Sequence, residues 1–188
     1  MLAVLTTFIC LPKIVYPHTM TSEHHTGRLI ASLAACLIPG YVALYLFTTS
    51  IPRWYAGLKK PGFVPPDIIV FYAIIIVFCL LGLTLYTIWN AGLTDHEVRT
   101  TLVILLFDLV LFFLWFVVFF YLQAVFLALV VMMMVIAATL CTLVQVLSTS
   151  VASALFMVPC LIVLLIFCYA NLQIFLMNPE LPAWGSLL

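Results

Sequence analysis

The sequence predicts an all-α, polytopic membrane protein built as a bundle of five transmembrane helices. Apolar residues make up 68% of the 188 residues and charged residues only 6%, whereas soluble domains carry about a quarter charged residues. The apolar residues also gather in runs long enough to cross a bilayer core of about 30 Å, which takes roughly 20 residues per helix. The net charge is zero and Lys and Arg form no run, so the sequence excludes the basic surface that binds nucleic acid.

The first two spans are expected at about residues 29–48 and 68–89, because neither run contains a charged residue. Asp67 directly follows two prolines and is expected to cap the start of the second helix, and Gly92 is expected to end it. Residues 1–28 are expected to form an N-terminal tail or a segment on the membrane surface. The apolar run at their start is too short to span the bilayer and lacks the basic flank of a signal peptide.

The apolar run from Thr100 to Val146 must contain a turn, because a single helix of that length would measure about 70 Å. The polar-tipped residues near its middle place this turn at Tyr121 to Gln123. Two helices are therefore predicted, at about residues 95–121 and 124–147. Thr94 followed by Glu97 is a capping-box pattern that would start the first of them.

A fifth helix is expected at about residues 151–177, after the polar residues 148–150. Pro159 and Asn171 are assigned structural roles in this helix, since a proline frees a backbone carbonyl that its neighbours must satisfy. Residues 29–178 form one domain in this prediction, and residues 179–188 form a C-terminal tail. The six cysteines lack Cys-x-x-Cys spacing, so no metal site is predicted.

The connection between the first two spans, residues 53–66, combines basic, aromatic and proline residues. Basic residues beside a membrane contact lipid headgroups or the anionic groups of a ligand, and aromatic residues there suit the belt at the membrane surface. This loop is therefore expected to have a function of its own. Besides its aromatic Trp54 and Phe63, the residues assigned to it are Arg53, Tyr55, Lys59, Lys60, Pro61, Pro65 and Pro66.

The aromatic residues, lysine and prolines of this loop also form a recognisable pattern. They follow the order Trp54-Tyr55-x-x-Leu58-x-Lys60-Pro61-x-Phe63-x-Pro65-Pro66. This pattern resembles the signature loop of the translocator protein family, also called the TspO/MBR or tryptophan-rich sensory family, although the family has Trp where Phe63 stands. The similarity covers about residues 29–176, and residues 53–58 are most similar to the animal mitochondrial members.

The resemblance implies a receptor or transporter-like protein whose first loop folds over a cavity that accepts porphyrins, sterols or aromatic drug-like molecules. For an animal-like member it implies the mitochondrial outer membrane. No cofactor is expected to be required, although a porphyrin or sterol is expected to bind. Membrane lipid, a second copy of the chain or a larger membrane complex are the expected partners. The predicted ligand-binding residues are Trp54, Phe63, Asp108, Phe112 and Trp115.

Asp108 is the one ionisable residue in the middle of a predicted span. A charged carboxylate there costs about 3 kcal/mol or more, so its side chain must face the bundle interior or water. Phe112 and Trp115 follow at spacings that place them on the same helical face. Two roles are open to Asp108. It lines a ligand site, or it stays protonated and fixes packing through a hydrogen bond to a residue such as Asn171 or Thr84.

Two other functions remain open. Aliphatic or small residues stand at several positions where the resembling proteins have ligand-facing aromatic residues. These departures favour a structural subunit of a larger membrane complex that binds no ligand. The second alternative is a porphyrin-degrading enzyme that uses Trp115, but no nucleophile lies beside a base, so we expect a protein that is not an enzyme. The departures are at Ile74, Leu127, Cys160 and Val163.

Overall fold

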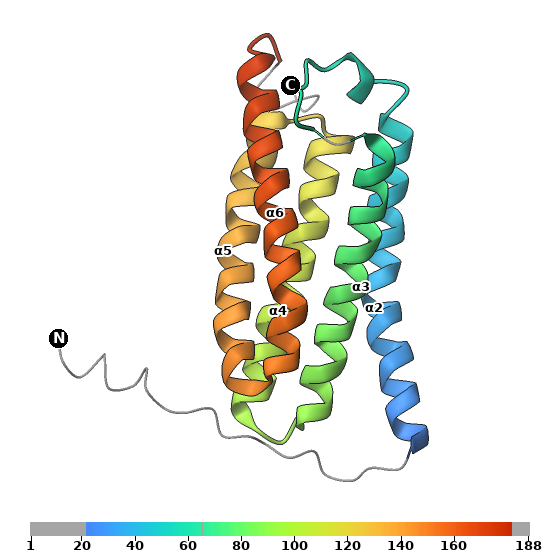
Figure 1. Ribbon diagram of the computed structural model, residues 1–188, viewed down its shortest axis with the longest axis vertical. Helices are drawn as coiled ribbons and strands as arrows, with labels where there is room; N and C mark the ends of the chain where they lie inside the picture. The colour runs from blue at the N-terminus through green and yellow to red at the C-terminus, as the bar shows by residue number, and fades with distance from the viewer. Residues whose placement is uncertain (1–21, 65, 182–188) are drawn as a thin grey trace, which may run out of the picture.

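Five long helices run side by side in the computed structural model, which describes residues 22–64 and 66–181 (Figure 1). Each helix is long and apolar enough to cross a membrane, and no β-strand occurs among the described residues. The predicted all-α, five-helix membrane fold is therefore confirmed. The helices are α2 (Ser22–Ser50), α3 (Asp67–Ala91), α4 (His96–Phe116), α5 (Val125–Thr149) and α6 (Val151–Met177).

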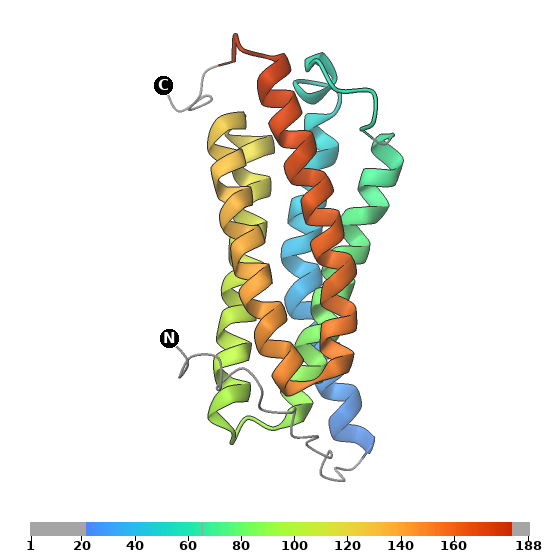
Figure 2. The ribbon, with the colours of Figure 1, turned by 60° about the vertical axis from the view of Figure 1, so that its left-hand side comes forward.

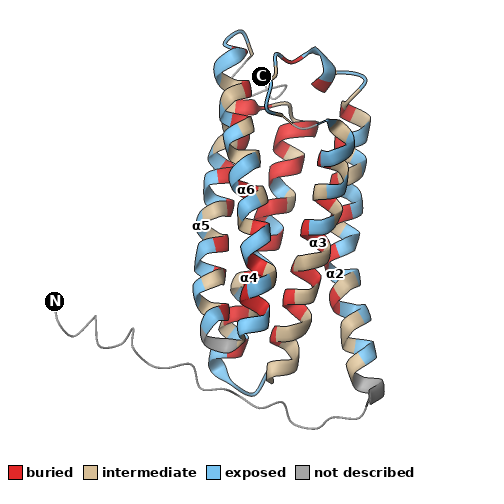
Figure 3. Ribbon diagram, in the orientation of Figure 1, coloured by how far each residue is buried: buried red, intermediate tan, exposed pale blue. Residues whose placement is uncertain are grey.

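The helices do not contribute equally to the bundle interior. In α4 half of the membrane-spanning window is buried, whereas in α2 the buried share is 22%. The most extensive contacts join α2 to α3, α3 to α6, α6 to α5 and α5 to α4. Figure 3 shows the buried residues on the inward faces and the exposed ones outside. Because the exposed large side chains include many apolar ones, such as Ile38 and Val110, the outer surface suits lipid.

The start of α2 differs from the sequence prediction. The helix begins at Ser22 rather than near residue 29, so part of the predicted N-terminal tail is helical, and residues 1–21 lie outside the described residues. Arg28 holds this polar first part of α2 against α3. Its Nη1 donates to Asn90 Oδ1 at 3.3 Å, and its guanidinium lies 5.9 Å from the ring centre of Trp89. The start of α2 is thus fastened to the end of α3.

Two helix caps are displaced by one residue from the predicted positions. Pro66 occupies the cap position of α3, and Asp67 is the first helical residue. There its carboxylate interacts favourably with the positive end of the helix dipole. Asp95 caps α4 in place of Thr94, because its side chain accepts a hydrogen bond of 3.0 Å from the Glu97 backbone. Gly92 ends α3 as predicted, with a positive φ of 107°.

The turn between α4 and α5 lies where the sequence places it, but a π-helical segment precedes it. This segment, η3 (Val117–Tyr121), continues α4 with a wider turn. Gln123 then adopts a positive φ of 57°, and the chain reverses into α5. Ser50 at the end of α2 donates to the Phe120 carbonyl at 3.1 Å, which joins η3 to the neighbouring helix.

A glycine allows α2 and α3 to approach closely. A Cβ at Gly40 would lie 2.7 Å from the Phe78 ring, well inside van der Waals contact. We therefore expect Gly40→Ala to destabilise the bundle by about 1–3 kcal/mol, measured as a lower Tm in detergent. Gly27→Ala, in the same helix with nothing within 4 Å of the added carbon, is the matched control. An unchanged Tm for Gly40→Ala would show that the α2–α3 contact is not tight.

Candidate functional site

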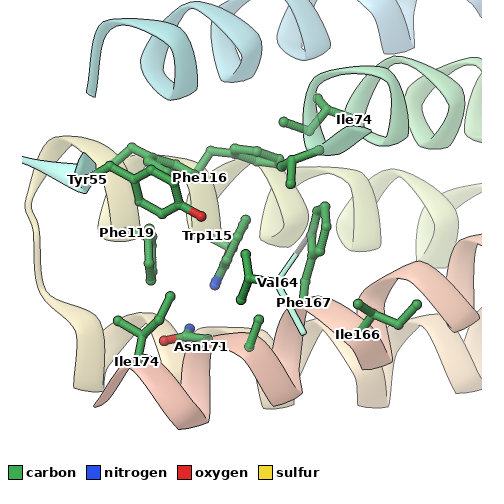
Figure 4. Close-up of a pocket in the computed structure, with 13 residues that line it drawn as sticks. Tyr55, Val64, Ile74, Trp115, Phe116, Phe119, Ile166, Phe167, Asn171 and Ile174 are labelled. Atoms are coloured by element: carbon green, nitrogen blue, oxygen red, sulfur yellow. The ribbon is translucent and has the colours of Figure 1, made fainter. Parts of the chain in front are cut away.

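A cavity of about 40 Å³ lies beneath the 53–66 loop, between α3, α4, η3 and α6 (Figure 4). Its lining is apolar except for the Tyr55 hydroxyl, the Asn171 carboxamide and the indole nitrogen of Trp115. Figures 1 and 2 both place this loop and the C-terminal end of α6 at the same end of the bundle. The lining residues are Tyr55, Val64, Val70, Ile74, Trp115, Phe116, Phe119, Phe120, Ile166, Phe167, Ala170, Asn171 and Ile174.

Trp115 forms the centre of an aromatic wall in this cavity. Its ring stacks on Phe119 at a centroid distance of 5.4 Å and an angle of 28°. It also stacks on Phe167 of α6 at 5.8 Å and 22°. The indole is only 5% exposed. Near-parallel rings of this kind present flat apolar faces, the geometry that favours offset stacking with another planar ring system.

Asn171 fixes the position of Trp115. The orientation of its carboxamide follows from the hydrogen bonds around it. Its oxygen accepts from Trp115 Nε1 at 3.2 Å and its nitrogen donates to the Val125 carbonyl at 3.2 Å. One buried side chain of α6 therefore holds both α4 and α5. The sequence-based alternative that Asn171 hydrogen-bonds Asp108 is wrong, because the carboxamide is committed to these other partners.

Tyr55 is the loop residue that reaches furthest into the site. It belongs to a short 3₁₀ turn, η2 (Tyr55–Gly57), and is 5% exposed. Its ring lies edge-on to Phe47 and Phe119, and the Lys60 ammonium lies 3.6 Å from its ring centre on the loop side. In Figure 4 the hydroxyl points toward the cavity. Tyr55 thus supplies one of the few polar atoms there.

Trp54 and Phe63 were predicted to contact a ligand, but neither lines the cavity. Trp54 packs edge-on against Phe119 at 5.6 Å, behind the aromatic wall. Phe63 is 45% exposed and stacks on Tyr169 at 4.8 Å on the outside of α6. The loop turns tightly here, with Val64 N donating to the Pro61 carbonyl at 3.1 Å, so adjacent side chains point different ways. Val64 enters the cavity in place of Phe63.

The loop is tied to the end of α6 through Asn178. The Asn178 oxygen accepts from Lys59 N at 3.0 Å, and its nitrogen donates to the Lys59 and Ile174 carbonyls at 2.9 and 2.7 Å. Asn178 is buried. The nearby ion pair between Lys59 and Glu180 is 3.5 Å long, but its side chains are 65% and 60% exposed, so it contributes little. Asn178 therefore provides the main attachment of the loop to the end of α6.

Asp108 and Phe112 lie on the same face of α4 as Trp115 but deeper in the bundle. They line a second, smaller cavity of about 10 Å³. Phe112 stacks on Phe78 at 5.2 Å. Asp108 Oδ1 accepts a hydrogen bond from Thr139 Oγ1 at 3.0 Å, while Thr84, the other partner considered, donates to the Leu80 carbonyl. The residues predicted to form one ligand site on α4 therefore line two separate cavities.

Comparison with known proteins agrees with this architecture. Residues 32–177 match the TspO/MBR family. The chain belongs to the TspO/MBR family. It is also 34% identical over 152 residues to the tryptophan-rich protein TspO of Archaeoglobus fulgidus, and the match covers 80% of this chain and 97% of that relative. This TspO/MBR protein is accordingly an integral, multi-pass membrane protein.

The remaining residues singled out in this TspO/MBR sequence lie around the site rather than in it. Arg53 is exposed and Pro61 is partly buried in the loop. Pro66 stands at the start of α3, and Pro65 lies outside the described residues. Pro159 lies inside α6, next to Cys160 of the second cavity.

Several lining residues of the TspO/MBR cavity were missed at the sequence level. Phe119 follows Trp115 by one helical turn, and that spacing alone places both rings on one face. In α6 the lining residues form a helical stripe around one polar residue. They are Ile166, Phe167, Ala170, Asn171 and Ile174. Both signals were present in the sequence. The contact between Asn178 and the loop had no such signal in the sequence, since its partner Lys59 is 119 residues away.

Tyr55 generates a prediction about pH. Burial, with a smaller contribution from the Asp67 charge, raises the pKa of Tyr55 to about 12, against about 10 in an unfolded chain. The unfolded state therefore releases this proton first, and stability is lost as pH rises from 10 towards 12, by up to about 1.4 kcal/mol per unit. This loss of stability is measured by denaturing detergent-solubilised wild type and Tyr55→Phe at a series of pH values. The exposed Tyr45→Phe is the matched control. Identical pH profiles for wild type and Tyr55→Phe would contradict the burial of this hydroxyl.

Proposed function

We propose that this protein is a membrane receptor or transporter-like protein that binds a hydrophobic planar ligand in the cavity under the 53–66 loop. The ligand class is a porphyrin or other tetrapyrrole, or a sterol or related lipid. The observation that carries the proposal is the near-parallel stack of Phe119, Trp115 and Phe167 in the cavity wall. Largely apolar cavities with a few polar groups are typical ligand sites, and flat rings stack on such a wall.

The size of the cavity requires that the loop move on binding. The space of about 40 Å³ admits a few water molecules, far less than a porphyrin ring or a sterol needs. Tyr55 and Val64 are the loop side chains that line it. Release of the loop from Asn178 would withdraw both and enlarge the site. In this proposal the loop acts as a lid, and its position against Asn178 is the closed one.

The surroundings of the cavity suit a ligand that arrives from the membrane. Ile166 lines the cavity and is also 44% exposed on the outside of α6. Ile166 thus supports a route by which a hydrophobic ligand would enter directly from lipid in this proposal. Lys60 lies over Tyr55 at the loop side, where an ammonium group can pair with an acidic substituent of the ligand. Arg53 and Lys59 are more exposed, which suits lipid headgroups.

A structural subunit that binds no ligand is the second candidate function. The specific observation in its favour is Ile74, a buried aliphatic residue in the cavity lining where the resembling animal proteins have Trp. In that case the tightly packed rings of the cavity would serve stability alone, and the chain would be isolated with stable partner chains. A lone chain or a homodimer in mild detergent favours the receptor.

Two further expectations belong to the proposal. The similarity of residues 53–58 to animal members supports a mitochondrial outer-membrane location, which imaging of a tagged chain would test. Porphyrin breakdown remains the enzymatic alternative, and loss of porphyrin absorption that depends on light or oxygen and on Trp115 would favour it over simple binding.

Trp115 supplies the direct test of the ligand site. Replacement by Ala removes the centre of the stack, and we expect it to weaken protoporphyrin binding at least tenfold, measured by titration of the porphyrin absorption in detergent. Tryptophan fluorescence quenching with Trp115→Phe, which keeps an aromatic ring, reports whether the porphyrin lies at this residue. Trp89→Phe, beside Arg28, is the control. Unchanged affinity in Trp115→Ala would place the ligand elsewhere, and no saturable binding by a folded sample would favour the structural subunit.

Asn178 supplies the test of the lid. Asn178→Ala removes the two hydrogen bonds that join it to the Lys59 backbone in the loop, each with a net value of about 1 kcal/mol. We expect porphyrin association and dissociation to accelerate roughly tenfold or more, measured by stopped-flow fluorescence.

Glu180→Gln is the matched control for the lid, because it removes only an exposed ion pair and should change the rates little. Rates that are equal in wild type and Asn178→Ala would show that the loop does not control access to the cavity.

A further inference from the structure

The second cavity is separate from the proposed ligand site and contains the one acidic side chain described inside the bundle. Asp108 lies in the middle of α4 and is 3% exposed. Its Oδ1 accepts the hydrogen bond from Thr139. Its Oδ2 is buried and has no hydrogen-bond partner among the described residues. A buried oxygen without a partner is costly, so native proteins rarely leave one unsatisfied.

The groups around Asp108 come from three other helices and carry no positive charge. Val77 and Leu81 of α3 and Leu164 of α6 are apolar. Thr142 of α5 also lies within hydrogen-bonding reach of the carboxyl. Its hydroxyl proton goes to the Ala138 carbonyl at 2.9 Å, so toward Asp108 the Thr142 oxygen is an acceptor. Cys160 of α6 lies near the carboxyl, and its thiol donates to the Phe156 carbonyl at 3.3 Å.

The described Lys and Arg residues lie away from this cavity, in the 53–66 loop or near helix ends. They are Arg28, Arg53, Lys59, Lys60 and Arg99. A carboxylate at Asp108 would therefore be an isolated charge in an apolar interior, which burial strongly disfavours. A neutral carboxylic acid avoids this cost, but it has an O–H group that needs an acceptor.

The cavity offers room for a further acceptor beside the Thr142 oxygen. Its volume of about 10 Å³ is close to the least space that one buried water molecule needs. Two polar groups line it, the Asp108 carboxyl and the Thr139 hydroxyl, together with the Cys160 sulfur. The Thr139 oxygen donates to Oδ1 and keeps free lone pairs, so it can accept from a water molecule.

We propose that this cavity is a binding site for one proton and one water molecule, in which Asp108 is a carboxylic acid whose Oδ2–H donates to the buried water. The water in turn donates to Thr139. The site links α4 and α5 through neutral groups, with Cys160 and Leu164 of α6 in its lining, and it does not depend on a ligand in the cavity beneath the 53–66 loop.

Infrared spectroscopy of the full chain tests the proton. The aspartates of the chain are Asp67, Asp95 and Asp108, and the first two lie at helix ends. Carboxyl ¹³C-labelling of aspartate distinguishes them from glutamate. At pH 7 we expect a labelled C=O band of a protonated acid, which Asp108→Asn removes. If wild type shows only labelled carboxylate bands, the proposal is overturned. The wild-type spectrum decides this even where Asp108→Asn fails to fold.

Filling the cavity tests the water. Cys160→Leu adds apolar atoms to the lining and should displace the water, so the acid loses this acceptor and its C=O band shifts to higher wavenumber. The matched control is Cys141→Leu, an exposed cysteine of α5, which should leave the band unchanged. A band that does not move in Cys160→Leu would overturn the water site.

Discussion

The fold depends on polar contacts between helices inside an apolar environment. In lipid, helices gain little hydrophobic free energy by packing against one another, so close contacts and hydrogen bonds must hold them. Asn171 supplies the central contact, because it joins α6 to Trp115 of α4 and to the backbone of α5. Thr139 with Asp108 and Thr87 with Ser153, at 3.0 and 2.6 Å, join further helix pairs. Each contact is worth about 0.6 kcal/mol on average, and together they fix which helices are neighbours.

The aromatic residues of the cavity beneath the 53–66 loop pack against one another as well as facing open space. Trp115 contacts Phe116, Phe119, Phe120 and Phe167. A ligand that enters must therefore separate rings that already make favourable contacts. The affinity of the site depends on the difference between ring–ligand and ring–ring stacking rather than on the ring–ligand contacts alone. This makes the position of the loop, which adds Tyr55 to the same cluster, part of the energetics of binding.

Composition and run length were enough to predict the membrane fold, because the bilayer thickness dictates helix length and lipid leaves the backbone few alternatives. The candidate site was harder. Helical periodicity placed Asp108, Phe112 and Trp115 on one face. However, seven residues of α-helix span about 10 Å, and the sequence does not show that side chains from other helices separate that space into two cavities. Phe63 was misplaced because the direction of a loop side chain depends on a tight turn. Asn178 was missed because its contact with Lys59 joins distant parts of the chain.

The π-helical segment η3 has a consequence for how the sequence can change. A π turn contains one residue more than an α turn, and such turns are frequent at functional sites. In η3 it brings Phe119 and Phe120 to the interior together with Trp115. Loss of one residue here would convert the π turn into an α turn, which has no room for all of the buried side chains that η3 now carries. The aromatic wall is thus more sensitive to a deletion in residues 117–121 than to many conservative substitutions, so the length of this segment is itself a determinant of the site.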